Sequence, residues 1–172
     1  MDHQPAPEHA SVVIRPYEHS DAPETLAVFI SAVTETASAD YTAEQVQAWA
    51  QPGRRDVGTW HVAMLARSSV VATIGGELAG FSDVSPHGYL DMMFVSPRHQ
   101  RRGVAGLLLA HVEARARSEG TPALSADVSI TARPFFERHG FTVEAEQHPV
   151  KAGVELTNYK MRKELRKADV AS

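Results

Sequence analysis

The sequence predicts a mixed α/β (α+β) fold, in which helices pack on a mostly antiparallel sheet of about seven strands. Short apolar runs at 69–74, 78–84 and 89–95 follow one another across glycine-bearing turns, as in an antiparallel meander. Apolar residues at helical spacing precede and follow this meander. A strand, a helix and a strand then follow in order between 89 and 128, so the two strands of this unit should run parallel.

The composition limits the range of functions. The chain has 172 residues, 43% hydrophobic and 22% charged, so we expect one globular domain at 11–165 between polar tails at 1–10 and 166–172. A formal net charge of −4 argues against a general nucleic-acid binder, and the absence of cysteine excludes disulfides and cysteine nucleophiles. No apolar run approaches the roughly 20 residues of a membrane span, so we expect no membrane partner and a cytoplasmic location.

The N-terminal part of the domain predicts one strand and three helices. β-branched residues at 11–17 favour a strand. Ser20 or Asp21 can cap the first helix, which apolar residues at helical spacing then continue. A capping box at 42–45 predicts the second helix, and 56–66 is a third helical stretch.

The C-terminal part alternates helices and strands after the meander. We predict a helix at 103–119, a strand at 124–128 and a helix at 131–139. Residues 141–146 and 154–161 are typical of a final hairpin.

The most informative segment is 94–106, where an apolar strand leads through a basic loop into a helix. A helix start presents unpaired N–H groups and a partial positive charge, and both attract phosphate. Gly103 has no Cβ to keep a diphosphate from the backbone, two small residues follow it, and two arginines precede it. The segment is neither a Walker A motif nor a dinucleotide fingerprint, because the glycine and lysine spacings differ.

This loop also carries a family resemblance. Gln100-Arg101-Arg102-Gly103-Val104-Ala105 resembles the Q/R-x-x-G-x-G/A motif of the GNAT superfamily of acyl-CoA-dependent N-acetyltransferases. Segments 89–97 and 134–141 resemble the family's strand before the motif and its late helix. Segments 40–49 and 156–161 resemble a bacterial subgroup of small members. The resemblance implies a GNAT-like sheet with helices on both faces, splayed between the fourth and fifth strands.

The resemblance, which extends over about 11–163, implies acetyl-CoA as the co-substrate. The loop would hold its pyrophosphate, and the backbone of the preceding strand would pair with the pantetheine arm. The residues implied in cofactor binding are Met93, Phe94, Val95, Gln100, Arg101, Arg102, Gly103, Val104, Ala105, Gly106 and Phe136. We expect no metal, because the nine histidines form no close helical pair and no H-E-x-x-H pattern.

Acetyl transfer to an amine needs a base and a donor for the developing oxyanion. Asp91, on the strand before the motif, is the first candidate base; the alternative is a structural ion pair. Tyr41 is the second catalytic candidate, and the neighbouring Asp40 ranks after it. Tyr41 either positions the amine or packs beside a helix cap. The resemblance implies direct attack by the amine, with a backbone N–H near Phe94 or Val95 stabilising the oxyanion.

One position departs from the family's pattern. Many members carry a tyrosine four residues before the Gly-Phe pair, which protonates the departing thiolate, and here that residue is Phe136. Either water or Tyr159 then protonates the thiolate, or the thiolate leaves unassisted. Trp49 and Trp60 are either core residues or an aromatic wall for the acceptor.

Three functions follow from these residues. The first is an N-acetyltransferase that moves acetyl from acetyl-CoA to a primary amine of a small molecule or peptide. The second is an acyl-CoA-binding sensor without turnover, which Phe136 favours. The third is a protein-interaction domain with no CoA site. The resemblance adds a homodimer to the expectations.

Overall fold

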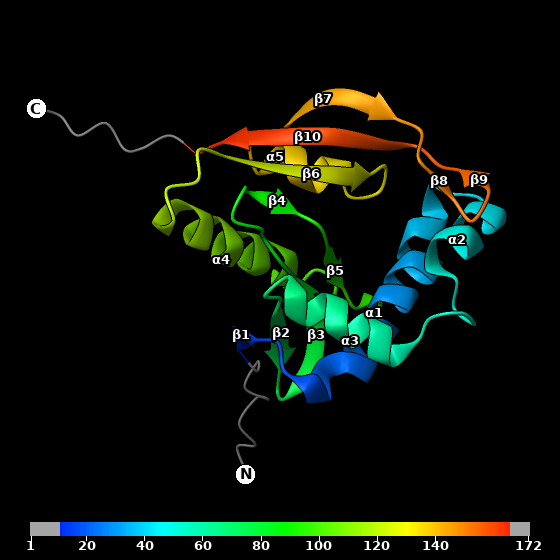
Figure 1. Cartoon of the computed structure of the whole chain (residues 1–172), viewed down its shortest axis with the longest axis horizontal. Helices are drawn as coiled ribbons and strands as arrows, with labels where there is room; N and C mark the ends of the chain where they lie inside the picture. The colour runs from blue at the N-terminus through cyan, green and yellow to red at the C-terminus, as the bar shows by residue number, and fades with distance from the viewer. Residues whose placement is uncertain (1–10, 166–172) are drawn as a thin grey trace, which may run out of the picture.

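Two four-stranded sheets form the framework of the computed structural model, which describes residues 11–165 (Figure 1). The predicted tails at 1–10 and 166–172 lie outside the described residues. The first sheet has the order β1 (Val12–Pro16), β2 (Val70–Ile74), β3 (Glu77–Ser82) and β5 (Met93–Val95). The second has the order β4 (Tyr89–Leu90), β6 (Ala123–Ser129), β10 (Asn158–Glu164) and β7 (Thr142–Gln147). A small hairpin joins β8 (Val150–Lys151) and β9 (Val154–Glu155).

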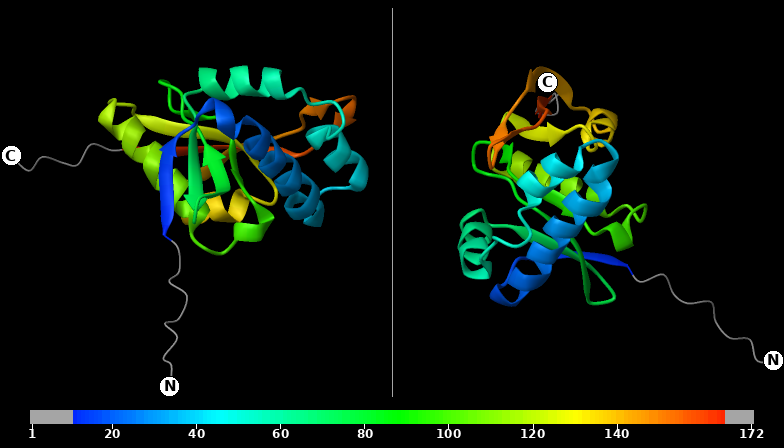
Figure 2. Two further views of the ribbon diagram at one scale, coloured as in Figure 1. Left: turned by 90° about the horizontal axis from the view of Figure 1, so that it is seen from below. Right: turned by 90° about the vertical axis from the view of Figure 1, so that its right-hand side faces the viewer.

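Helices cover both faces of the first sheet. α1 (Ala22–Ser31) and α3 (Val57–Ala66) lie on one face and α4 (Val104–Ser118) lies on the other. α2 (Ala43–Ala50) packs against residues 32–36, and α5 (Arg133–Arg138) packs against β6 of the second sheet. In β2, Val70, Ala72 and Ile74 belong to a core shared with α4, α5 and the second sheet. Val71 belongs to a second core shared with α1, α2 and α3. Because successive strand residues point to opposite faces, β2 is buried on both sides, and the left view of Figure 2 shows α3 and α4 on opposite sides of β1, β2 and β3.

The strand pairings confirm the mixed, mostly antiparallel fold. Within the described residues, β4 and β6 form the single parallel pair, with Tyr89 opposite Ser125 and Leu90 opposite Ala126. The strand–helix–strand prediction is therefore correct. The meander is also confirmed, because β2 pairs with β3 and β3 with β5 in antiparallel register.

The predicted continuous strand at 89–95 is wrong. It divides at Asp91 and Met92, so that β4 pairs with β6 in one sheet and β5 pairs with β3 in the other. The physical reason is a buried carboxylate: Asp83 accepts hydrogen bonds from the backbone N–H groups of both residues at the break. The opening expected between the fourth and fifth strands begins at this break.

The last predicted strand also has different bounds. Residues 154 and 155 belong to the β8–β9 hairpin, and the long strand begins only at Asn158. β10 lies between β6 and β7 and pairs with both, which explains why it extends to Glu164. The second helix begins as predicted, since Thr42 and Gln45 form both hydrogen bonds of the capping box.

The first helix begins at one of its two predicted caps, but without the side-chain hydrogen bond of a cap. Asp21 is its N-cap, but the Asp21 carboxylate binds Arg15 at 2.7 Å and caps no helical N–H. The chain continues past α1 as a π-helical segment at Ala32–Thr36 and a 3₁₀ turn at Ala37–Ala39. This extension reaches the cavity described below. In the part of the chain from 11 to 165, no helix combines the length and the apolar character that crossing a membrane requires.

Candidate active site

The loop at 100–106 turns the chain sharply between β5 and α4. Arg101 and Gly103 have positive φ angles of 63° and 76°, and α4 begins directly afterwards at Val104. A Cβ built on Gly103 would meet no atom within 4 Å, so the left-handed backbone, and not crowding by the protein, favours glycine here. The first N–H groups of α4 have no partner within the helix and face this open space. The local geometry is that of an anion site.

A cavity of about 640 Å³ adjoins this loop. All of the residues implied in cofactor binding line it except Arg102, namely Met93, Phe94, Val95, Gln100, Arg101, Gly103, Val104, Ala105, Gly106 and Phe136. The cavity also reaches the end of the α1 extension at Thr36, α2 at Trp49, the end of β6 at Ser129 and α5 at Arg138. The structure therefore gathers the loop and the strand before it around one space.

One wall of this cavity is a strand edge. β5 is the last strand of its sheet, and among residues 11–165 no strand pairs with its outer edge. β6 belongs to the other sheet. It pairs with β4 as far as Leu90 and Ala126, and beyond that point β5 and β6 are not paired. The unpaired backbone groups of β5 are available to an extended ligand, as in recognition by β-strand addition.

The charges around the cavity favour an anion. Arg101 and Arg138 line it, and no aspartate or glutamate is among its lining residues. Gln100 Nε2 donates to Thr36 Oγ1 at 3.0 Å, which ties the loop to the extension of α1. His99 also lines the cavity and is buried, with Nε2 3.6 Å from a carboxylate oxygen of Glu77.

Asp91, the first candidate base, lies at the break between β4 and β5 and is not among the residues that line the cavity. Its carboxylate is 3.4 Å from Arg67 Nη1, and its side chain is 44% exposed. Arg67 also lies 3.3 Å from the buried Asp83. The Asp91 carboxylate therefore does not border the cavity directly.

Tyr41, the second catalytic candidate, ties together segments that are distant in the sequence. Its hydroxyl donates to the carbonyl of Thr157 at 2.6 Å and accepts from the backbone N–H of Ile130 at 3.0 Å. Burial raises the pKa of this hydroxyl, so it stays protonated at neutral pH. Beside it, Asp40 accepts a hydrogen bond at 2.8 Å from Thr131, a residue of the cavity wall.

The aromatic candidates divide between core and cavity. Trp60 is buried, and its indole N–H donates to Thr25 at 3.0 Å, so it is a core residue. Trp49 lines the cavity, with its ring centroid 5.5 Å from that of Tyr41. We call Asp40, Tyr41 and Trp49 the α2 wall. Phe136 lines the cavity from α5 and is 5% exposed.

Tyr159, the alternative proton donor, is not among the cavity-lining residues, and the Arg133 guanidinium lies 4.5 Å from its ring centroid. Sequence reasoning missed Thr36, Ser129 and Arg138 as lining residues. Thr36 and Ser129 carry no motif that could have indicated a site. Arg138 lies in the segment that resembles the family's late helix, two residues before the Gly-Phe pair, and that was the only available signal.

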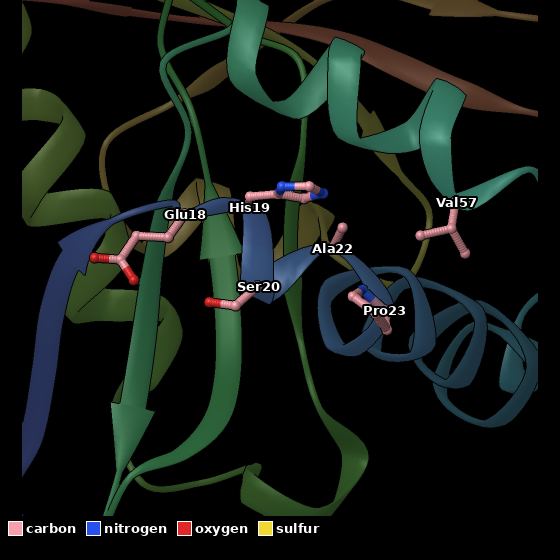
Figure 3. Close-up of a pocket in the computed structure, with 6 residues that line it drawn as sticks. All are labelled: Glu18, His19, Ser20, Ala22, Pro23 and Val57. Atoms are coloured by element: carbon pink, nitrogen blue, oxygen red, sulfur yellow. The ribbon is translucent and has the colours of Figure 1, made fainter.

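A second cavity of about 630 Å³ lies where α1 and α3 begin (Figure 3). Glu18, His19, Ser20, Ala22, Pro23 and Val57 line it, and their labelled side chains do not converge on one point. None of the predicted site residues is among them. Over residues 11–165, no group of three or more His, Asp or Glu side chains has the arrangement that a metal ion needs.

Comparison with known proteins agrees with this geometry. A family model described as an acetyltransferase (GNAT) domain matches residues 37–163. The uncharacterized N-acetyltransferase YafP of Escherichia coli (strain K12) is 42% identical over 153 residues, which are 88% of this chain and 95% of that protein. A GCN5-related N-acetyltransferase from Rhodopseudomonas palustris has a TM-score of 0.86 and 28% identity, over 91% of this chain and 98% of that one. YncA from Salmonella typhimurium, solved with its cofactor acetyl-CoA, shares the fold at a TM-score of 0.67 and 19% identity, over 95% and 99% of the chains.

Proposed function

The chain belongs to the GNAT family of acyl-CoA-dependent N-acetyltransferases, and from that premise we propose how its residues hold acetyl-CoA and transfer the acetyl group to a primary amine. One observation carries the proposal: the start of α4 and the free edge of β5 meet in a single cavity. A pyrophosphate fits the unpaired N–H groups of the helix start, with Arg101 and Arg138 beside it. An extended pantetheine arm fits the edge of β5 at Met93, Phe94 and Val95.

The proposed reaction is a direct transfer. An amine must first lose a proton, because a lysine-like ammonium group has a pKa of about 10.4 in water. Its nitrogen then attacks the thioester carbonyl carbon, a C–N bond forms, and the C–S bond breaks to release the CoA thiolate. The nitrogen loses a second proton to water to give the neutral amide. A backbone N–H near Phe94 or Val95 stabilises the negative charge on the carbonyl oxygen. Asp91 accepts the amine proton through water.

The α2 wall lies on the acceptor side in this proposal. Trp49 offers an aromatic face to the amine. Tyr41 connects the start of α2 to Thr157 and Ile130 through its hydroxyl, and so fixes the position of these segments. Phe136 has no proton to donate, so water or Tyr159 protonates the thiolate, or it leaves unassisted. The acceptor is a small molecule or a peptide.

Thiol release from acetyl-CoA across a panel of amines tests the activity. We expect release above the no-acceptor control for at least one amine, and tight binding of CoA by calorimetry. Tight CoA binding without release for any amine would favour the second function, an acyl-CoA sensor, for which Phe136 is the supporting residue. No binding of CoA would contradict both.

Asp91→Asn tests the base. General bases contribute about 100-fold to 10,000-fold, so kcat/KM should fall by at least about 100-fold if Asp91 takes the proton. A fall of less than about tenfold would assign Asp91 to its ion pair with Arg67 instead.

The remaining expectations belong to the same proposal. They are a cytoplasmic location, a homodimer, and no nucleic-acid or membrane partner. Light scattering of the purified chain tests the dimer, and a monomer at all concentrations would contradict it.

A further inference from the structure

The opening between the two sheets begins at one short break, and a buried carboxylate lies against it. Asp83 follows β3 and is 1% exposed. Its carboxylate accepts a hydrogen bond from the N–H of Asp91 at 2.9 Å and another from the N–H of Met92 at 3.1 Å. These residues belong to no strand, because β4 ends at Leu90 and β5 begins at Met93. Asp83 therefore supplies the acceptors that a neighbouring strand supplies elsewhere.

Two further side chains hold the same break. Ser82 donates its hydroxyl to the carbonyl of Met92 at 2.8 Å, so consecutive residues at the end of β3 bind both polar backbone groups of Met92. The β3–β5 ladder ends at the pair Ser82 and Met93, and these side-chain bonds extend it by one residue. Arg67, at the end of α3, lies 3.3 Å from the Asp83 carboxylate.

We propose that Asp83 is a positioning residue for acyl-CoA, which holds the break so that the free edge of β5 faces β6 across the cavity. This inference rests on the proposed function. Met93 directly follows the bound peptide and already lines the cavity. A shift of the break would displace the backbone N–H groups of Phe94 and Val95, which the proposed reaction uses.

The charge of Asp83 supports a role beyond packing. Burial raises the pKa of its carboxyl group to about 6, although the N–H of Asp91 and the charge of Arg67 act in the opposite direction. The charged and titratable groups within electrostatic reach are Arg67, Asp91 and Tyr89. Protonation places a hydrogen on one of the two oxygens that accept backbone N–H groups. Acyl-CoA affinity should therefore fall as the pH drops through about 6.

Asp83→Asn tests the inference, because asparagine keeps one oxygen acceptor but turns an NH₂ group toward the other N–H. At about pH 7.5 we expect the Kd of CoA and the KM of acetyl-CoA to rise at least about tenfold. The loss of CoA affinity between about pH 7 and pH 5 should be present in the natural chain and largely absent from the variant. A merely structural role would change the melting temperature and leave the pH profile as it is.

Asp127→Asn is the matched control, because it removes a carboxylate on the neighbouring strand β6 that, among residues 11–165, forms a hydrogen bond only with the exposed hydroxyl of Tyr89. Its CoA affinity should stay within about twofold of the natural chain. A folded Asp83→Asn protein with the CoA affinity and pH profile of the natural chain would overturn the inference, even though the proposed function stands. A natural chain that binds no CoA at any pH contradicts the proposed function, and this inference with it.

Should Asp83→Asn fail to fold, two other measurements decide. Ser82→Ala removes only the bond to the Met92 carbonyl, and it should also weaken CoA binding at least about threefold. Amide hydrogen exchange of Met92 in the natural chain should be as slow as exchange in β3. Rapid exchange at Met92, or unchanged CoA affinity in Ser82→Ala, would overturn the inference.

Discussion

The loop at 100–106 lines the cavity and the α2 wall reaches it through Trp49, but the two regions are built in opposite ways. The loop is one continuous segment whose shape follows from its own backbone, with positive φ angles at Arg101 and Gly103 before a helix start. The α2 wall depends on contacts between distant segments, since Tyr41 binds a carbonyl 116 positions later and a backbone N–H 89 positions later. A local site of this kind can be altered without unfolding the chain. A wall assembled from distant segments couples the acceptor side to global stability.

The strongest test of this comparison is Gly103→Val. A β-branched residue at a φ of 76° costs about 1–3 kcal/mol, and its side chain occupies the open space beside the helix start. We expect the affinity for CoA, measured by calorimetry, to fall by at least about 100-fold.

Gly120→Val is the matched control for that variant. Gly120 has a φ of 74° and open space around it, like Gly103, but it lies at the other end of α4. Both variants should lose similar stability, and only Gly103→Val should lose CoA binding. Equal affinities in the two variants would show that the loop is not where the cofactor binds.

The buried carboxyl group of Asp83, which binds the break between β4 and β5, predicts a pH effect on stability. Its pKa rises from 3.8 to about 6 in the folded state, so the folded chain binds the proton more tightly than the unfolded chain. The stabilisation from this group is complete below about pH 3.8 and is lost as the pH rises through about 6, with a total of about 3 kcal/mol. Urea unfolding from about pH 4 to pH 7 should show this slope in the natural chain and not in Asp83→Asn. Parallel profiles would contradict it.

Tyr41→Phe tests whether the α2 wall is coupled to stability. The change leaves the partly buried N–H of Ile130 without its acceptor, which should lower the free energy of unfolding by about 1–3 kcal/mol. Tyr89→Phe is the control, because the Tyr89 hydroxyl bonds to Asp127 at the surface. Its loss should change the free energy of unfolding by less than about 0.5 kcal/mol. If the Tyr41→Phe protein keeps its stability but its kcat falls, the Tyr41 hydroxyl acts in the reaction and does not mainly connect distant segments.

The smallest expected effect is that of Trp49→Ala. Loss of the aromatic face should raise the KM of the amine about fivefold and leave the Kd of CoA nearly unchanged. Trp49→Phe should restore most of the difference. An equal loss of CoA affinity would place Trp49 on the cofactor's side of the cavity.

How much the sequence predicted depended on how local each feature is. The capping box of α2 and the loop before α4 rest on residues a few positions apart, and the structure has both as expected. The predicted continuity of the strand at 89–95 was wrong because its break is held by Asp83, a residue that directly follows β3. The predicted bounds of β10 were wrong because they depend on its pairing with two neighbouring strands. Nothing in the local pattern around these segments carries that information.

The sequence by itself determined the fold class, the family and the loop at 100–106, because hydrophobic periodicity and a helix start are encoded in neighbouring residues. Only the tertiary structure decided that Asp91 pairs with Arg67 away from the cavity, that Trp49 lines it, and that Asp83 holds the break. These are relations between segments that meet only after the two sheets have formed. They follow from burial and hydrogen bonding across the whole domain, which spacing along the chain does not record.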